Sequence, residues 1–299
     1  MLDLRRLAVF REVAERGSFS EAAAALDYTQ SAVSHHVAKL ESELGMSLFE
    51  RGRRPVRLTP AGERMREHAG ALIGAAAAAE DEMRALAGLE TGLVRVGAFL
   101  SACTTFMPNA IGRFAAKHPS VEVRLDQEEP PVAVPRLIAG ELDLAVVYRE
   151  RAEPSEPDPR LESMALGDDA YRIVLHPQHR LARRRTVAFA DLEGERFAAP
   201  RAAGGGVRYR AMVERLCGDE GFTPNMAYAV DDVTVARAFV AAGLAVGVMP
   251  DMTIGHPRSD VVVKPIKGME PFRTIEACWV RGRRAAGIAQ MVEALQASM

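Results

Sequence analysis

A polar stretch near the start of the chain carries side chains suited to contacts with nucleic acid. It runs from residue 29 to residue 39 and contains no acidic residue. The side chains expected on its exposed face are Thr29, Gln30, Ser31, Ser34, His35 and Lys39. On the first turns of a helix, such donors and acceptors match base edges in the DNA major groove, and the helix dipole favours phosphate. A solvated polar face on an ordinary helical domain is the alternative interpretation.

A cluster of arginines follows this stretch. Arg51, Arg53, Arg54 and Arg57 lie within seven residues that contain no acid. Guanidinium groups pair with phosphates or enter a narrow minor groove, so this cluster is a second candidate for DNA contact. The formal net charge of the chain is −2, which excludes non-specific coating of nucleic acid but permits a local basic site.

Hydrophobic spacing and capping residues place the polar stretch on the third of three helices. Helices are expected over residues 4–15, 22–26 and 29–44, the last capped by Thr29 and ended by Gly45. Its buried face holds Val33, Val37, Leu40 and Leu44. Residues 47–51 and 56–58 are expected to form a two-stranded wing. The order predicts a winged helix-turn-helix, which we call the head.

A long helix is expected after the head, with Thr59 as its cap and Pro60 at its first position. Apolar residues repeat along it at spacings of four and three, namely Met65, Ala69, Leu72, Ala76, Ala79, Met83 and Leu86. This is the spacing of a coiled-coil seam, so the helix is expected to join two copies of the chain. Packing of the same face on its own domain is the alternative.

From Gly92 onward, expected strands and helices alternate. The order is β-α-β-α-β over residues 93–147, which implies a parallel sheet with right-handed crossovers. A second run of strands and helices is expected over residues 171–249. The last strand and helix are expected at 275–280 and 285–297.

Composition and motifs argue against several classes of protein. No apolar run is long enough for a membrane span, and the N-terminus lacks the pattern of a secretory signal. Cys103, Cys217 and Cys278 are expected to be reduced thiols of a cytoplasmic protein. His176 and His179 fit a turn at a strand end better than a metal site. No catalytic motif is present, so neither an enzyme nor a cofactor is expected.

The head resembles that of the LysR-type transcriptional regulators. The resemblance rests on SFSEAAAAL at 18–26, TQSAVS at 29–34, LFER at 48–51 and LTPAG at 58–62. It extends more weakly through FAAKHP at 114–119, GELDLA at 140–145 and AGLAVGVMP at 242–250. The sequence departs from the family where Ser31 replaces a common proline, and where His35 and His36 replace residues such as Arg or Gln. Both departures weaken any transfer of base preference from the family.

The resemblance implies an α/β chain with an N-terminal winged helix-turn-helix, a long linker helix and a two-lobed effector domain like a periplasmic solute-binding protein. We place the head at residues 1–59, the linker and dimerisation helix at 60–90, and the effector-binding domain at 91–299. Lobe I is expected at about 91–161 and 268–299, and lobe II at about 162–267. Assembly into dimers or tetramers is implied as well.

Ligands of open α/β sheets bind beyond the carboxyl ends of the strands. In lobe I this places Ser101, Ala102 and Thr104 beside the cleft, and Glu128 follows the next strand. Arg201 and Gly204 follow a strand of lobe II; a flexible loop explains them equally well, and the resemblance favours the cleft. Arg201 could pair with a carboxylate, whereas Glu128 could select an amine, pair with Arg201 or point outward. The effector is therefore expected to be a carboxylate or a zwitterion.

The resulting prediction is a sequence-specific regulator that binds double-stranded promoter DNA and responds to a small molecule between its lobes. RNA polymerase is a further candidate partner, and no membrane contact is expected. A thiol-based redox sensor of the same fold is one alternative, although no second cysteine lies near Cys103 or Cys217 in sequence. A transporter's solute-binding protein is another, but it would need a signal peptide and no head.

Overall fold

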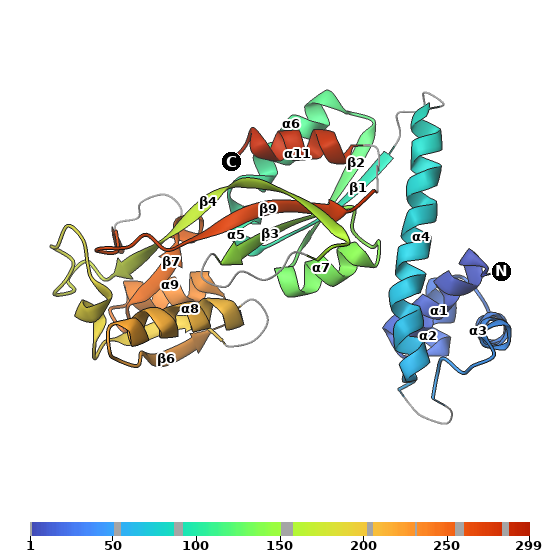
Figure 1. The fold of residues 1–299 in the computed structure, drawn as a ribbon, viewed down its shortest axis with the longest axis horizontal. Coiled ribbons are helices and arrows are strands. Elements are labelled where there is room, and N and C mark those ends of the chain that lie inside the picture. The colour runs from blue at the N-terminus through green and yellow to red at the C-terminus, as the bar shows by residue number, and fades with distance from the viewer. Residues whose placement is uncertain are drawn as a thin grey trace.

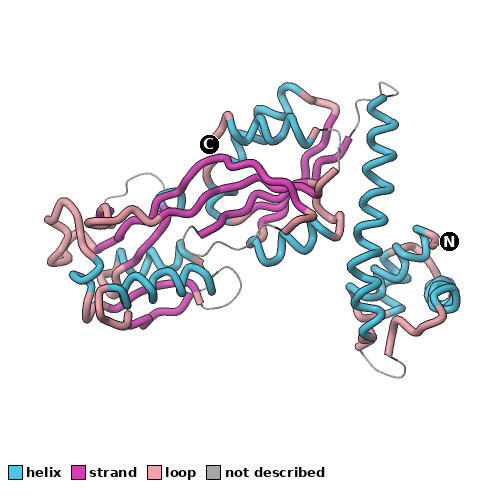
Figure 2. Tube along the Cα trace, viewed as in Figure 1, coloured by secondary structure: helices cyan, strands magenta, loops and turns pink. Residues whose placement is uncertain are grey.

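The computed structural model describes residues 2–50, 55–86, 92–150, 158–201, 206–230, 232–254, 260–282 and 287–299. A three-helix head and a two-lobed domain lie on either side of one long helix, α4 (Figure 1). The two-lobed domain contains both helices and strands, whereas α1, α2, α3 and α4 are helices (Figure 2). Among the described helices, none is long and apolar enough to cross a membrane.

The head consists of α1 (Leu4–Arg16), α2 (Phe19–Ala25) and α3 (Gln30–Leu44). Each begins at a residue whose side chain accepts a backbone N–H of the first turn, namely Asp3, Ser18 and Thr29. Gly45 ends α3 with a φ of 68°, a left-handed conformation that glycine adopts at little cost. Valine, leucine and phenylalanine side chains of α1 and α3 form its core. The three predicted helices are therefore confirmed.

The apolar residues of the predicted seam lie on helix α4 (Pro60–Leu86) and fall into two groups. Met65 and Ala69 pack into the core of the head, as the alternative interpretation held for this part. Leu72 and Met83 are exposed, at 41% and 57%. The first turns of α4 thus belong to the head, and the later turns present apolar side chains to solvent in the single chain.

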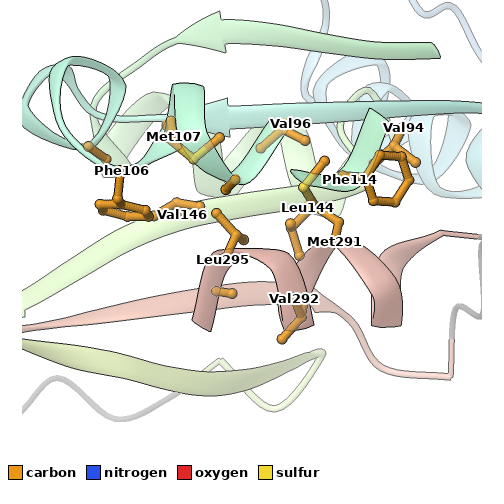
Figure 3. Packing of buried hydrophobic residues seen from close by; sticks show 14 of the residues in the cluster. Val94, Val96, Phe106, Met107, Phe114, Leu144, Val146, Met291, Val292 and Leu295 are labelled. Carbon is orange, nitrogen blue, oxygen red and sulfur yellow. The ribbon is translucent and has the colours of Figure 1, made fainter. Parts of the chain in front are cut away.

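Lobe I holds a sheet with the strands β1 (Gly92–Ala98), β2 (Val121–Gln127), β3 (Leu144–Glu150) and β9 (Phe272–Val280). Strand β1 pairs in parallel with β2 and β3, as the β-α-β-α-β order predicts, whereas β9 runs antiparallel to β3. The helices are α5 (Leu100–Thr104), α6 (Met107–Lys117), α7 (Pro130–Ile138) and α11 (Ile288–Gln296). Figure 3 shows residues of α11 packed with β1, β3 and α6 in one core. The predicted return of the last strand and helix to lobe I is confirmed.

Lobe II contains the remaining elements. They are η1 (Phe189–Leu192), β5 (Arg196–Pro200), α8 (Gly206–Asp219), β6 (Asn225–Val230), α9 (Val233–Ala241), β7 (Gly247–Pro250), α10 (Asp251–Ile254) and β8 (Val262–Lys264). Strands β5 and β6 pair in parallel, and Phe197 bridges to Val246 beside β7. A separate core fills this lobe.

One long strand, β4 (Leu161–Leu175), belongs to both lobes. Nine of its first ten residues pair with β9, with a register shift at Leu166, and its last five pair with β7 and β8. The strand order is β2-β1-β3-β9-β4-β7. The border that we expected at residue 161 therefore falls at the start of a continuous strand, which the sequence indicated only from residue 171. The two lobes share hydrogen-bonded backbone across the border.

Helix α4 also contacts the two-lobed domain. A methyl group on Gly70 would lie 2.4 Å from the backbone oxygen of Ala139, the residue that ends α7. This distance is shorter than any real contact, so only glycine permits the approach. Figure 1 shows α7 on the side of the domain that faces α4.

Candidate nucleic-acid interface and inter-lobe cavity

The first three turns of α3 expose a row of polar side chains. Val33, Val37 and Leu40 are buried in the head and fix which face of the helix points outward. The exposed residues are Thr29, Gln30, Ser31, Ser34, His35 and Lys39. No acid interrupts the row, and the α3 N-terminus adds the partial positive charge of the helix dipole. All six predicted residues are therefore accessible, around the part of α3 that does not pack into the head.

Local contacts order the start of this row. Thr29 Oγ1 accepts the Ala32 N–H at 3.2 Å and lies 3.0 Å from Ser31 Oγ. His36 is half-buried and stacks on Tyr28, with ring centroids 5.7 Å apart, whereas His35 is exposed. Tyr28 is 39% exposed beside the cap of α3, and its place on this surface was missed from the sequence. The stacking partner explains why only one of the two histidines faces outward.

The wing is tied to α3 by Glu41. Its carboxylate accepts the backbone N–H groups of Leu48 at 2.6 Å and Phe49 at 3.2 Å. Of the predicted two-stranded wing, the described residues contain the antiparallel bridge between Phe49 and Leu58. The predicted DNA contacts Arg51, Arg53 and Arg54 lie outside the described residues. Glu41 was not expected to matter, because an acid near the end of α3 gives no hint of backbone partners.

A cavity of about 440 Å³ lies between the two lobes. We call it the inter-lobe cavity. Lobe I supplies Phe99, Leu100, Ser101, Gln127, Glu128, Glu129, Val132, Tyr148 and Glu150, and lobe II and the crossing strands supply Tyr171, Pro200, Arg201, Tyr209, Asp232, Val233, Pro250, Thr253 and Arg273. The volume fits a small organic molecule.

Arg273 of β9 closes one side of this cavity. Its Nη2 donates to Ser101 Oγ at 2.7 Å, and its Nε and Nη2 donate to one carboxylate oxygen of Asp169. The guanidinium carbon lies 4.9 Å from the centroid of Phe99 and 4.6 Å from that of Tyr148. Burial raises the pKa of Asp169, and the charge of Arg273 opposes that rise. Arg273 thus meets its counter-ion within the protein.

Three tyrosines of the cavity donate their hydroxyl protons to protein acceptors. Tyr148 donates to Glu129 at 2.9 Å, Tyr171 to Glu150, and Tyr209 to the backbone oxygen of Val248. Burial raises the pKa of the Tyr148 and Tyr171 hydroxyls, and the adjacent carboxylates raise it further. These hydroxyls stay protonated and keep their acceptor lone pairs.

The predicted effector-binding residues divide between the cavity and other places. Ser101, Glu128 and Arg201 line it, and Gly204 lies outside the described residues. Ala102 does not line it, because α5 begins at Leu100 and turns that methyl into the core of lobe I. The Thr104 hydroxyl donates to the backbone oxygens of Leu100 and Ser101, and this residue lines a different hollow. Arg273, Glu150 and Tyr171 were missed.

The remaining candidate groups have local roles. Burial raises the pKa of the Cys103 thiol and raises those of Cys217 and Cys278 to about 12. A thiol must ionise to react, so these surroundings do not favour a redox sensor. His176 and His179 each accept a backbone N–H two residues on through Nδ1, as in the predicted turn.

Two family models together match nearly the whole chain. The model for the LysR substrate binding domain matches residues 87–299, and that for the bacterial regulatory helix-turn-helix protein, lysR family, matches residues 4–63.

Relatives and solved structures agree with this match. The transcriptional regulator ShiR of Corynebacterium glutamicum is 32% identical over 94% of each chain. The RuBisCO operon transcriptional regulator of Allochromatium vinosum is 31% identical over 95% of this chain and 91% of its own. The LysR family regulator CbnR superposes with a TM-score of 0.68 at 26% identity, covering 99% of both chains. Full-length OxyR of Pseudomonas aeruginosa superposes with a TM-score of 0.75 at 23% identity, over 100% of this chain and 94% of its own.

Proposed function

The chain belongs to the LysR family of bacterial transcriptional regulators, and we propose that a molecule in its inter-lobe cavity controls how its heads hold promoter DNA. The protein is a DNA-binding regulator with an effector domain. The relatives compared with it are named as transcriptional regulators, and none of them is named as an enzyme. We propose a cytoplasmic location, because a regulator of this family acts on chromosomal DNA.

The observation that carries the DNA contact is the acid-free, exposed row on α3. Gln30 lies at its start, where a side-chain amide pairs with an adenine edge, and Ser34 is one turn further. Thr29, Ser31, His35 and Lys39 surround them and reach base edges or phosphates. Arg51, Arg53 and Arg54 are proposed as phosphate contacts of the wing. Phosphate contacts position the head, and base contacts choose the sequence.

Assembly follows from α4. Its later turns expose Leu72 and Met83, which suits packing against the same helix of a second copy. We propose a dimer built on this helix, paired further into a tetramer, with RNA polymerase as the partner at the promoter. Two heads held at a fixed distance would read two half-sites.

Control requires that the effector bind one arrangement of the lobes better than another. Ser101, Glu128 and Arg201 come from different segments that line the inter-lobe cavity, so a ligand that contacts all three favours the closed arrangement. Because β4 and β9 join the lobes, closure changes the geometry of the whole effector domain and of the α4 helices attached to it.

A gel-shift titration with the DNA upstream of the protein's own gene tests the proposal. Binding should weaken steeply between 50 and 200 mM salt, by about a thousandfold for six phosphate contacts. Gln30→Ala should relax the choice of base at one position, whereas Gln178→Ala, the same change at an exposed site in lobe II, should not. Binding that does not respond to salt would contradict the proposal.

A further inference from the structure

More acidic than basic side chains line the inter-lobe cavity. Among its described side chains, four carboxylates face two guanidiniums. The acids are Glu128, Glu129, Glu150 and Asp232, and the bases are Arg201 and Arg273. Arg273 is already paired with Asp169, a buried carboxylate behind the wall. The cavity therefore holds more negative than positive charge before any ligand enters.

Glu128 is only partly neutralised. Its Oε1 pairs with Arg136, but that guanidinium also binds Asp126 at 3.0 Å and Glu141 at 3.0 Å. The other oxygen of Glu128, Oε2, is buried and has no hydrogen-bond partner among the described residues. A buried carboxylate oxygen without a donor is costly, so the negative charge of Glu128 is not fully compensated within the described residues.

The three tyrosine hydroxyls of the cavity offer no proton to a ligand. The protons of Tyr148, Tyr171 and Tyr209 are all directed to protein acceptors, so these hydroxyls offer lone pairs to a ligand. Arg273 already lies over the rings of Phe99 and Tyr148, which shows that the aromatic part of this wall accommodates a cation. Carboxylates, hydroxyl lone pairs and aromatic faces together suit a cation and disfavour an anion.

We propose that the effector of this regulator carries a protonated amine, bound by Glu128 and Glu129, with its carbon frame against the aromatic side chains. The proposal rests on the function proposed above for the inter-lobe cavity. Amines and amino acids belong to this ligand class, because the ammonium is the recognised group. Simple carboxylates do not belong to it.

Calorimetric titration of the intact protein at pH 7 tests the proposal with matched probes. Each pair has an aromatic amine and a carboxylate of similar size: 2-phenylethylamine with 3-phenylpropionate, and tryptamine with indole-3-propionate. We expect each amine to bind about tenfold more tightly than its partner, as loss of a charge-assisted hydrogen bond implies. If no amine in the set binds more tightly than its carboxylate partner, the proposal is overturned.

Glutamine variants, which keep the shape of the glutamate side chain, test which residues bind the amine. Glu128→Gln and Glu129→Gln should each weaken amine binding about tenfold, since the charge is lost and the volume is kept. Glu122→Gln makes the same change at an exposed position of β2 and should leave binding unchanged. Amine binding that neither cavity variant weakens would also overturn the proposal.

Gel shifts on the same preparations distinguish a failure of the amine proposal from a failure of the proposed function. Tight, salt-sensitive DNA binding with a preference for carboxylate probes would refute the amine and leave the regulator intact. Failure of the unmodified protein to bind its upstream DNA would refute the proposed function itself.

Discussion

Arg273 and Asp169 form a buried ion pair at the crossing between the lobes. Two nitrogens of the guanidinium donate to one carboxylate oxygen at 3.0 and 2.9 Å, and the side chains are only 7% and 1% exposed. The other oxygen of Asp169 accepts the Met252 N–H of α10 at 3.0 Å. The pair therefore joins β9, β4 and lobe II behind the wall of the inter-lobe cavity.

Removing one partner of this pair should destabilise the effector domain. Asp169→Ala leaves a buried guanidinium without its counter-ion, and we expect a loss of about 3 kcal/mol in the free energy of unfolding by urea. The double variant with Arg273→Met should recover part of that loss. Glu122→Ala, which breaks an exposed pair with Arg124, should cost less than about 1 kcal/mol. Similar losses for the two single variants would contradict the assignment.

Replacement of two helical glycines by alanine should change stability in opposite directions. A methyl group on Gly62 would lie 2.1 Å from the backbone oxygen of Leu48, so Gly62→Ala should destabilise the head by about 1–3 kcal/mol. Nothing lies within 4 Å of a methyl group on Gly112, an exposed residue of α6. Gly112→Ala should therefore stabilise lobe I by about 0.5–1 kcal/mol. Thermal unfolding followed by circular dichroism measures both, and effects of the same sign would be inconsistent with this packing.

Gly70→Ala should alter the arrangement of head and effector domain. The added methyl would collide with the backbone of Ala139, so α7 must move away from α4. We expect DNA affinity to stay within about threefold, because residue 70 does not belong to the exposed row on α3, while the DNase I footprint changes. Gly112→Ala is the control for a general effect of the substitution. An unchanged footprint would show that the α4–α7 contact is dispensable.

The thiols should react slowly in the folded protein. Cys217 and Cys278 have pKa values raised to about 12 by burial, so at pH 8 iodoacetamide should label them far more slowly than in urea. Because the unfolded chain releases these protons near pH 9, stability should fall as the pH rises above that value. Mass spectrometry after timed labelling measures the rates. Rapid labelling of either residue in the native protein would restore the redox alternative.

The head could be predicted from sequence because its determinants are local. Thr29, Gly45 and the buried valines of α3 lie within one helix length of each other, so caps and spacing were sufficient. The inter-lobe cavity could be predicted only in part. Glu128 and Arg201 follow their own strands, whereas Arg273 reaches Ser101 across 172 residues of sequence, through a strand pairing that no local pattern contains.

The errors in the cavity have a comparable cause. Ala102 and Thr104 were placed beside Ser101 because they follow the same strand exit, but the helical turn of α5 points neighbouring side chains in different directions. The length of β4 was underestimated because its first half alternates poorly: several residues that pair with β9 remain exposed. Tertiary pairing determines that strand more than its composition does.

Helix α7 connects the inter-lobe cavity with helix α4. Its capping residue, Glu129, lines the inter-lobe cavity, and at its other end Ala139 lies against Gly70 of the helix that carries the head. Its nine helical residues, with Pro135 inside the helix, span about 13 Å. We expect a displacement of Glu129 to move α7 and, through the contact of Ala139 with Gly70, to move α4 and the head attached to it.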